Sequence, residues 1–334
     1  MNRATPPTGW VRNPTMINPR LDPRQASSYE LGWTWNPITG CLNHTNGLCK
    51  GGGFPCYAYR LAHGRLKERY LANKNHAPTQ VPGDGIWQVD PFYPRFWPNR
   101  LNPLSKASAY MNLKPKGIFV CDMSDLFGIG IPEDWTRQVL EHIKWCSQHR
   151  FYLLTKQPQN LQKFSPFPAN CWVGVTMTKP DPLALEYLDE VEAKIRYLSL
   201  EPMLARWPEI SFEEIPADWL IIGACTGSHS DLVALQQRYP ELALMPYGKK
   251  WTLQPRIEWV QEIVQAADKA GVAVFLKDNL KPLIDDNYPD RNRLVPNHDR
   301  LVRSPHPILC RQCKGDACSD CGVVWSLRRE FPQP

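Results

Sequence analysis

The chain has 334 residues, of which 43% are hydrophobic and 22% are charged. This composition is typical of a globular protein with a buried core, and the length suits one large domain or two ordinary ones. The net charge of +6 suits a nucleic-acid partner, but it does not distinguish such a protein from many enzymes.

The cysteine content and the lack of long apolar segments indicate the cellular compartment of the protein. Eleven cysteines are too few for a disulfide scaffold, and they cluster at spacings typical of metal ligands. Residues 1–10 lack the apolar stretch of a signal peptide, and no run of eighteen apolar residues occurs. We therefore expect a cytoplasmic protein with reduced thiols, a setting that permits iron–sulfur chemistry.

Three cysteines lie close together near the start of the chain. Residues 1–29 are expected to form an extended arm, and 29–35 a first strand. The loop that follows carries Cys41, Cys49 and Cys56, and its glycines and prolines allow the thiolates to turn toward one point. Three thiolates can hold an iron–sulfur cluster with one iron left open, whereas a structural zinc site closes with a fourth ligand.

A helix is expected to begin near Cys56. Its apolar face is formed at helical spacing by Tyr59, Ala62, Leu66 and Tyr70. Its other face carries cations: Arg60, Arg65, Lys67 and Arg69. The insert 73–116 is irregular and rich in proline and aromatic residues. Its aromatic side chains either stack on a nucleotide strand or pack into a small aromatic core, and we favour the aromatic core.

From residue 117 onward, short apolar strands alternate with helices. The strands are expected at 117–121, 151–154, 172–175, 195–198, 219–222 and 272–276. Helices are expected after Pro132, over 158–164 and 183–192, and from Pro255 to Gly271. Nearly continuous apolar strands in this alternation indicate an α/β fold with a parallel sheet covered on both faces.

Polar residues follow the expected strands at their carboxyl ends. They are Asp122, Asp125, Lys156, Thr176, Glu201, Cys225 and Lys277. In a barrel such strand ends converge at one mouth, where active sites lie. The pattern predicts a partial or full TIM-like (β/α) barrel over residues 30–280, with the cysteine loop above its mouth.

Several of these segments resemble the phage Gp37/Gp68-like (DUF5131) family of radical S-adenosylmethionine (SAM) proteins over about residues 30–280. The first block runs from Trp35 to Cys41 and is followed by Cys56-Tyr-Ala. Later blocks occur in the family's usual order: Phe119–Phe127, Leu154–Pro158, Trp172–Thr176, Leu198–Met203 and Phe275–Lys277. Gly223–Gly227 departs from the family's usual Gly-Gly-Glu-Ser-Gly, since Cys225 replaces a carboxylate.

The resemblance implies a radical SAM enzyme of the corresponding barrel type. It implies that Cys41, Cys49 and Cys56 hold a [4Fe-4S] cluster, whose open iron binds SAM and cleaves it reductively to a 5′-deoxyadenosyl radical. It further implies a reductant such as flavodoxin or ferredoxin, and a nucleic acid or nucleotide as the substrate that is modified or repaired.

The same resemblance suggests roles for the polar strand ends. Asp122, Ser124 and Asp125 follow the second strand, where relatives bind the methionyl amino group of SAM. Thr176 and Glu201 are candidates for the ribose hydroxyls or the substrate, and Lys156 and Lys277 for a carboxylate or phosphate. Cys225 is a candidate hydrogen-atom donor, although a small buried thiol is the commoner role of a free cysteine. We assign Cys121, Cys146 and Cys171 to the core.

The segment 281–334 contains a second group of cysteines at C-x2-C-x4-C-x2-C spacing, namely Cys310, Cys313, Cys318 and Cys321. Each C-x2-C pair can clamp a tetrahedral ion, which predicts a small metal-binding tail that holds zinc or an accessory iron–sulfur cluster.

Two other classes of function stay open. His44 or His63 could complete a zinc site with the three early cysteines, which would make the chain a zinc-stabilised nucleic-acid-binding protein. The second class is a metal-dependent barrel hydrolase, although no H-E-x-x-H pattern occurs among the eight histidines.

Overall fold

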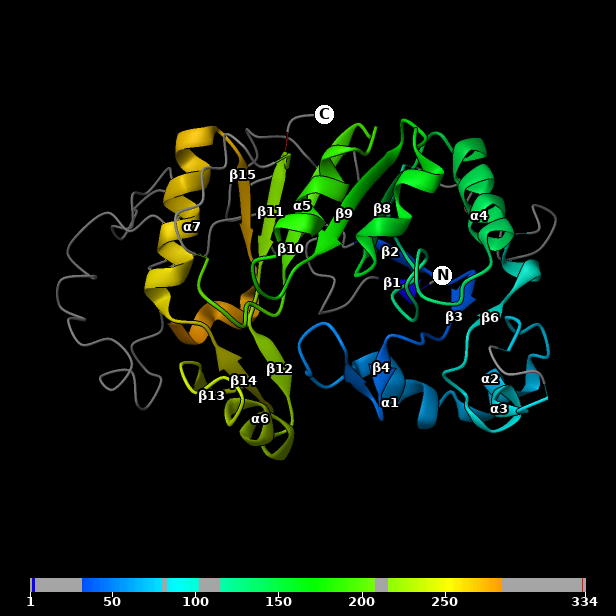
Figure 1. Ribbon diagram of the computed structural model, residues 1–334, viewed down its shortest axis with the longest axis horizontal. Coiled ribbons are helices and arrows are strands. Elements are labelled where there is room, and N and C mark those ends of the chain that lie inside the picture. The colour runs from blue at the N-terminus through cyan, green and yellow to red at the C-terminus, as the bar shows by residue number, and fades with distance from the viewer. Residues whose placement is uncertain are drawn as a thin grey trace. The chain divides into compact units, whose positions relative to one another are not determined.

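The structure, a computed structural model, describes residues 2–3, 32–79, 83–101, 115–207, 216–283 and 332 (Figure 1). The chain divides into two compact units. Of the described residues, the first unit holds 2–3, 32–79, 83–101, 115–175 and 186–196, and the second holds the rest.

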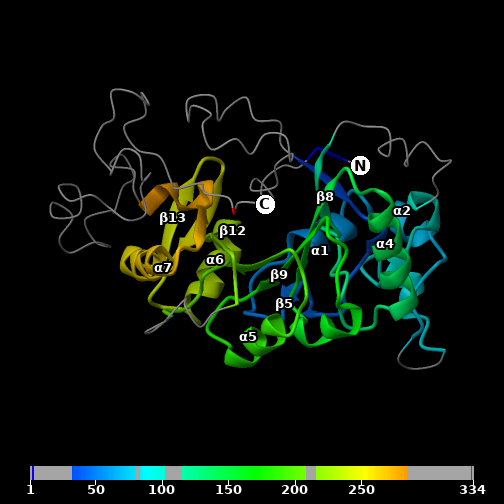
Figure 2. The same ribbon diagram turned by 90° about the horizontal axis from the view of Figure 1, so that it is seen from above.

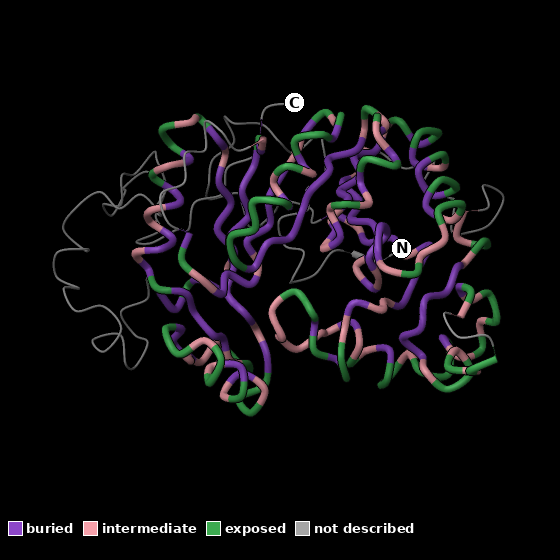
Figure 3. The backbone as a smooth tube through the Cα atoms, in the orientation of Figure 1, coloured by how far each residue is buried: buried purple, intermediate pink, exposed green. Residues whose placement is uncertain are grey.

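The first unit is built on a sheet with the strand order β1-β2-β7-β8-β9. The strands are β1 (Asn2–Arg3), β2 (Trp33–Trp35), β7 (Gly117–Val120), β8 (Arg150–Thr155) and β9 (Cys171–Thr176). β1 is antiparallel to β2, and the other pairs are parallel. Every residue of β7 and β9 is buried, which explains their continuous apolar sequences (Figure 3).

Helices connect these parallel strands. The crossover from β7 to β8 contains α4 (Glu133–Trp145), which buries Val139, Leu140 and Ile143 and has two carboxylates in its first turn. Two short 3₁₀ helices, η5 (Pro158–Asn160) and η6 (Gln162–Phe164), lie between β8 and β9. The helix α5 (Pro182–Asp189) follows β9.

The cysteine loop and the insert form smaller elements in the first unit. Two antiparallel pairs of short strands are present, β3 (Ile38–Thr39) with β6 (Arg95–Phe96), and β4 (His44–Thr45) with β5 (Leu48–Cys49). The helices are α1 (Tyr57–His63), α2 (Lys67–Ala72), α3 (Ile86–Val89) and the 3₁₀ helix η3 (Pro98–Arg100).

The single helix expected after Cys56 is divided into α1 and α2. The amide of Gly64 donates to the Arg60 carbonyl at the end of α1, and the Leu66 amide donates to the Leu61 carbonyl across the turn. Both helices still bury the predicted apolar side, since Ala62 and Tyr70 belong to one buried cluster. The aromatic core favoured for the insert is confirmed for Phe92, Tyr93 and Phe96, all of which are buried.

The second unit contains three parallel strands in the order β10-β11-β15. They are β10 (Ile195–Leu200), β11 (Trp219–Ile222) and β15 (Ala273–Leu276). The helix α7 (Ile257–Ala270) ends at Gly271, whose φ of 72° is the left-handed conformation predicted for its cap. The 3₁₀ helix η7 (Asp278–Leu283) follows β15.

A small antiparallel sheet in the second unit was not predicted. Its strands are β12 (Cys225–Gly227), β14 (Lys250–Gln254) and β13 (Ala243–Tyr247), in that order, and α6 (His229–Gln236) lies against them in both views (Figures 1 and 2). These strands contain polar residues and Pro246, so they lack the apolar runs that identified the parallel strands.

The α/β class and the parallel strands are therefore confirmed, with four parallel strands in the first unit and three in the second. A closed barrel is not formed, because in neither unit do the described strands return to pair with the first strand of that unit. The predicted limits of the arm, barrel and tail stay predictions, and nearly all of 1–29 and 284–334 lies outside the described residues. No helix of the described chain is long and apolar enough to cross a membrane.

Candidate functional site

Backbone hydrogen bonds give the cysteine loop, residues 36–56, a defined shape. The Gly40 amide donates to the Met123 carbonyl (2.9 Å) and the Cys41 amide to the Phe92 carbonyl (2.9 Å). Within the loop, the Cys49 amide donates to the Phe54 carbonyl (2.9 Å) and the Cys56 amide to the Gly47 carbonyl (2.8 Å). The three cysteines therefore have fixed backbone positions.

Two of the sulfur atoms accept hydrogen bonds from backbone amides. Cys41 Sγ accepts from the Asn43 amide (3.3 Å), and Cys56 Sγ accepts from the Tyr59 amide (3.5 Å) at the start of α1. Burial and then the charge of Asp125 raise the pKa of Cys41 to about 12, and burial also raises the pKa of Cys56. A bound cation is therefore needed to hold these groups as thiolates.

Lys156 lies close to the cysteine loop. It follows β8 directly, and both its Cδ and Cys49 Sγ would lie 3.8 Å from a Cβ placed on Gly51. Burial opposes its positive charge, but Cys49, Asp125, Cys56 and Cys41 together outweigh that effect and raise the pKa of Lys156. Lys156 therefore lies close to Cys49, and negative charge on any of the three cysteines favours its ammonium form.

The cysteines are neighbours without converging on one point. Cys41 interacts electrostatically with both Cys49 and Cys56. In the described part of the chain, however, no three His, Cys, Asp or Glu side chains are grouped tightly enough to hold a metal ion.

The loop after β7 is tied to the cysteine loop by side chains. The Asn36 amide nitrogen donates to the Asp122 carboxylate, and Asn36 Oδ1 accepts from the Met123 amide (2.9 Å). The Tyr57 hydroxyl donates to the Asp122 carbonyl, and the Ser124 hydroxyl donates to the Gly40 carbonyl. The structure thus brings Asp122 and Ser124 to the cysteine loop, as their position after the strand predicted.

Asp125 already uses both carboxylate oxygens within the fold. Oδ2 accepts from the Lys156 amide (2.9 Å) and Oδ1 from the Phe127 amide (3.1 Å). The carboxylate is buried, and it joins the end of β7 to the end of β8. Asn36 and Tyr57 are site residues that the sequence analysis did not select, although both lie within the quoted blocks.

In the second unit, Lys277 and Glu201 form an ion pair with side chains 7% and 19% exposed. Gly223 lies against both, since a Cβ there would be 2.9 Å from Lys277 Cδ and 3.3 Å from Glu201 Cγ. Asn279 holds the adjoining backbone, because its amide accepts from the Ala224 nitrogen (3.2 Å) and donates to the Ala224 oxygen (2.7 Å).

Two further predicted residues belong to the second unit. Cys225 follows Ala224, begins β12 and is 4% exposed. Thr176, the last residue of β9, is buried, and its hydroxyl has no hydrogen-bond partner among the described residues. Of the predicted residues in this unit, the structure therefore brings Glu201 and Lys277 into direct contact.

Comparison with known families identifies the chain. A family described as "Protein of unknown function (DUF5131)" matches residues 30–236. The chain belongs to the DUF5131 family. The matched region includes the cysteine loop, Asp122, Lys156, Glu201 and Cys225, and it ends before Lys277. The family description assigns no reaction, and no curated protein matches the sequence.

Among solved structures, this DUF5131 chain is similar to spore photoproduct lyase complexed with dinucleoside spore photoproduct. The TM-score is 0.45 and the identity 14%, over 78% of this chain and 81% of that chain. A double mutant of spore photoproduct lyase with bound AdoMet and dinucleoside spore photoproduct gives a TM-score of 0.44 at 12% identity, with the same shares covered. At these values the likeness assigns no reaction to the chain.

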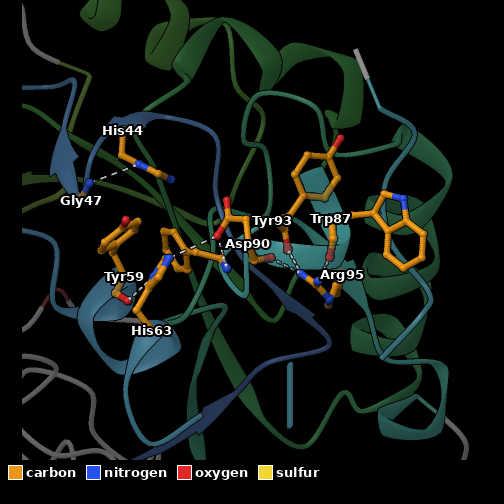
Figure 4. Close-up of polar contacts among 9 residues, drawn as sticks. His44, Gly47, Tyr59, His63, Trp87, Asp90, Tyr93 and Arg95 are labelled. Atoms are coloured by element: carbon orange, nitrogen blue, oxygen red, sulfur yellow. Dashed lines mark hydrogen bonds and ion pairs between the residues drawn. The ribbon is translucent and has the colours of Figure 1, made fainter. Parts of the chain in front are cut away.

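The histidines beside the cysteine loop of the DUF5131 chain have partners of their own (Figure 4). His63 Nδ1 lies 3.1 Å from the Tyr59 carbonyl, and its Nε2 lies 3.5 Å from Asp90 Oδ1. His44 Nδ1 accepts from the Gly47 amide (3.4 Å). Both nitrogens of His63 thus have partners other than the cysteines. The four cysteines expected to form the C-terminal metal site lie outside the described residues.

Proposed function

We propose that the chain is a radical SAM enzyme in which Cys41, Cys49 and Cys56 hold a [4Fe-4S] cluster. The observation that supports this proposal is the hydrogen-bonded cysteine loop, which holds three thiols on one short segment beside the loop after β7. When bound, the cluster supplies an electron that cleaves SAM to methionine and a 5′-deoxyadenosyl radical.

The chain's own groups suit such a cluster. Amide donors to Cys41 and Cys56 stabilise negative charge on sulfur, and hydrogen bonds of this kind tune iron–sulfur clusters. Lys156 offsets part of the negative charge of three thiolates, and its ammonium is also suited to bind a carboxylate. Cys49 is buried and Cys41 and Cys56 are half-buried, which limits the access of water to the sulfurs.

We assign the amino group of SAM to the loop after β7. Asp122 and Ser124 are fixed beside the cysteine loop by Asn36, Tyr57 and Gly40. The Asp125 oxygens are occupied by backbone amides, so Asp125 acts in this proposal by holding Lys156 and the loop in place. Asp122 is accordingly the carboxylate that we expect to meet the amino group.

For the remaining predicted residues we keep the roles that the family resemblance implied. The unpartnered Thr176 hydroxyl and Glu201 would contact ribose or substrate, and Lys277 a carboxylate or phosphate. Cys225 would donate a hydrogen atom. The substrate would be a nucleic acid or nucleotide, the electron donor a flavodoxin or ferredoxin, and the C-terminal cysteines would hold zinc or a second cluster.

The test is metal and sulfide analysis after anaerobic reconstitution, followed by a reductant-dependent assay for 5′-deoxyadenosine. Cys41→Ala, Cys49→Ala and Cys56→Ala should each lose about four irons relative to the unaltered chain. Cys225→Ala is the matched control and should keep its iron. Unchanged iron and 5′-deoxyadenosine in Cys41→Ala would show that the cluster site is wrong, and zinc without iron in the unaltered chain would favour the zinc-stabilised alternative.

A further inference from the structure

The exposed sides of α1 and α2 carry a dense set of cations. Residues 57–74 contain five lysines and arginines and one carboxylate, Glu68, so this short stretch carries most of the net charge of +6. All five cations are exposed, and we call them the basic ridge: Arg60, Arg65, Lys67, Arg69 and Lys74. The two helices lie in the same unit as the cysteine loop (Figure 1).

The ridge is fixed to the cysteine loop through the other side of the same helices. Ala58, Ala62 and Tyr70 are buried in one cluster with Phe92 and Met123. Cys41 and Cys56 pack against this cluster, and Cys56 is the residue that caps α1. The cations thus form the outer surface of an element whose inner surface contacts two of the three cysteines.

The charge of the ridge is poorly neutralised. In the described part of the chain, no carboxylate lies within ion-pair distance of Arg65, Lys67, Arg69 or Lys74. Unpaired cations concentrated on one surface attract a polyanion and release its counterions on binding.

Two of the cations rest on aromatic rings. The guanidinium of Arg69 lies 5.9 Å from the ring centre of Trp97, and that of Arg100 lies 4.2 Å from the same ring. Burial and, to a lesser extent, the charge of Arg69 lower the pKa of Arg100. The Lys74 ammonium lies 5.4 Å from the ring centre of Trp87. Trp97 thus holds two like charges near one another, an arrangement that an anion would stabilise.

We propose that the basic ridge binds the sugar–phosphate backbone of a nucleic acid and so brings a strand to the cysteine loop. This proposal rests on the function proposed above, because it gives a nucleic-acid substrate of that enzyme a binding surface next to the cysteine loop. A membrane-binding helix would add exposed apolar side chains that enter the bilayer. The large exposed hydrophobic residues of the described chain lie on neither α1 nor α2: Leu48, Ile86, Val89, Trp145 and Leu183.

The test compares two full-length variants with the same change in net charge. Arg65→Glu/Lys67→Glu/Arg69→Glu reverses the ridge, and Lys194→Glu/Lys249→Glu/Lys250→Glu reverses three exposed lysines elsewhere. Binding is measured by fluorescence anisotropy over a salt series with a labelled 20-mer, as single-stranded DNA, duplex DNA and RNA. Vesicles of phosphatidylcholine with phosphatidylserine form a separate arm.

The ridge variant should bind at least about tenfold more weakly at 0.1 M salt, and the slope of log K against log salt should fall by about two to three. The control should change by less than about threefold, because its lysines contact no phosphate. If Arg69→Glu lowers the melting temperature, Arg65→Gln/Lys67→Gln, which leaves Arg69 on Trp97, should still weaken binding.

Equal losses in the ridge and control variants, no loss in either, or binding to the acidic vesicles but to none of the 20-mers would overturn the proposal. Iron content and 5′-deoxyadenosine are measured on the same preparations. If the unaltered chain forms 5′-deoxyadenosine and the ridge variant still binds nucleic acid normally, the docking surface is wrong while the enzyme assignment stands. If the unaltered chain forms no 5′-deoxyadenosine but the ridge variant binds nucleic acid more weakly than the control, the docking surface is supported and the radical SAM assignment is wrong.

Discussion

The side-chain amide of Asn36 donates a hydrogen bond to the carboxylate of Asp122 and thereby joins the end of β2 to the loop after β7. The same amide accepts from the Met123 backbone. One residue of the sequence Trp35-Asn36-Pro37 therefore fixes the only carboxylate assigned to SAM. This contact can be tested without the cluster.

Asn36→Ala should lower the free energy of unfolding by about 1–3 kcal/mol, because it leaves the Asp122 carboxylate and the Met123 amide without their partner. Burial raises the pKa of Asp122, and the bond from Asn36 opposes that shift. The free-energy cost of burying the Asp122 carboxylate without Asn36 is absent while Asp122 is protonated, and it appears as the pH rises through the pKa of Asp122 in the folded chain. Asn36→Ala should therefore lose more stability at pH 8 than at pH 4. Urea unfolding at both pH values checks the difference, and an equal loss would contradict it.

The buried pair in the second unit predicts a double-mutant result. Lys277→Met should destabilise the fold by about 3–5 kcal/mol, because it leaves Glu201 largely buried and uncompensated. Lys277→Met/Glu201→Gln should recover most of that loss, since no charge then remains unpaired. Chemical denaturation of Lys277→Met, Glu201→Gln and the double variant measures the coupling, and additive losses would show that the pair is not formed in solution.

Arg95 predicts a stability effect in the insert. Its side chain is fully buried, and its guanidinium donates to the carbonyls of Trp87, Asp90 and Tyr93 (Figure 4). It also donates to the carbonyl of Asn73. Arg95→Lys keeps the charge but cannot reach all four, so it should cost about 3 kcal/mol or more. Thermal unfolding measures the loss, and limited proteolysis should locate new cleavage within 73–101. A melting temperature within about 1–2 °C of that of the unaltered chain corresponds to a loss of about 0.5 kcal/mol or less, and it would contradict the role assigned to Arg95.

The core cysteines predict a pattern of thiol labelling. Cys146 is fully buried, and burial raises its pKa to about 11, so about one thiol in a thousand is ionised at pH 8. Burial also raises the pKa of Cys171. Brief iodoacetamide treatment of the folded chain at pH 8 should leave both unmodified, whereas both should react in urea. Peptide mass spectrometry measures the ratio, and rapid labelling of the folded chain would show that this part of the core is open.

Hydrophobic patterns in the sequence identified the buried parallel strands and the end of one helix. The apolar runs predicted at 117–121, 172–175 and 219–222 correspond to the buried parallel strands β7, β9 and β11, because a strand covered on both faces must be apolar throughout. The left-handed Gly271 marked the end of α7. The sheet of β12, β14 and β13 escaped notice, because its short strands carry polar side chains and a proline.

By itself, the sequence determined the alternation of strands and helices, the assignment of Cys121, Cys146 and Cys171 to the core, and the grouping of three cysteines on one loop. Only the tertiary structure decided which polar side chains meet. It brought Lys156 close to Cys49, paired Lys277 with Glu201, and used the Asp125 oxygens for backbone amides. The physical reason is that periodicity reports which face of an element is buried, whereas hydrogen bonds and ion pairs depend on residues far apart in the chain that meet only when the strands have paired.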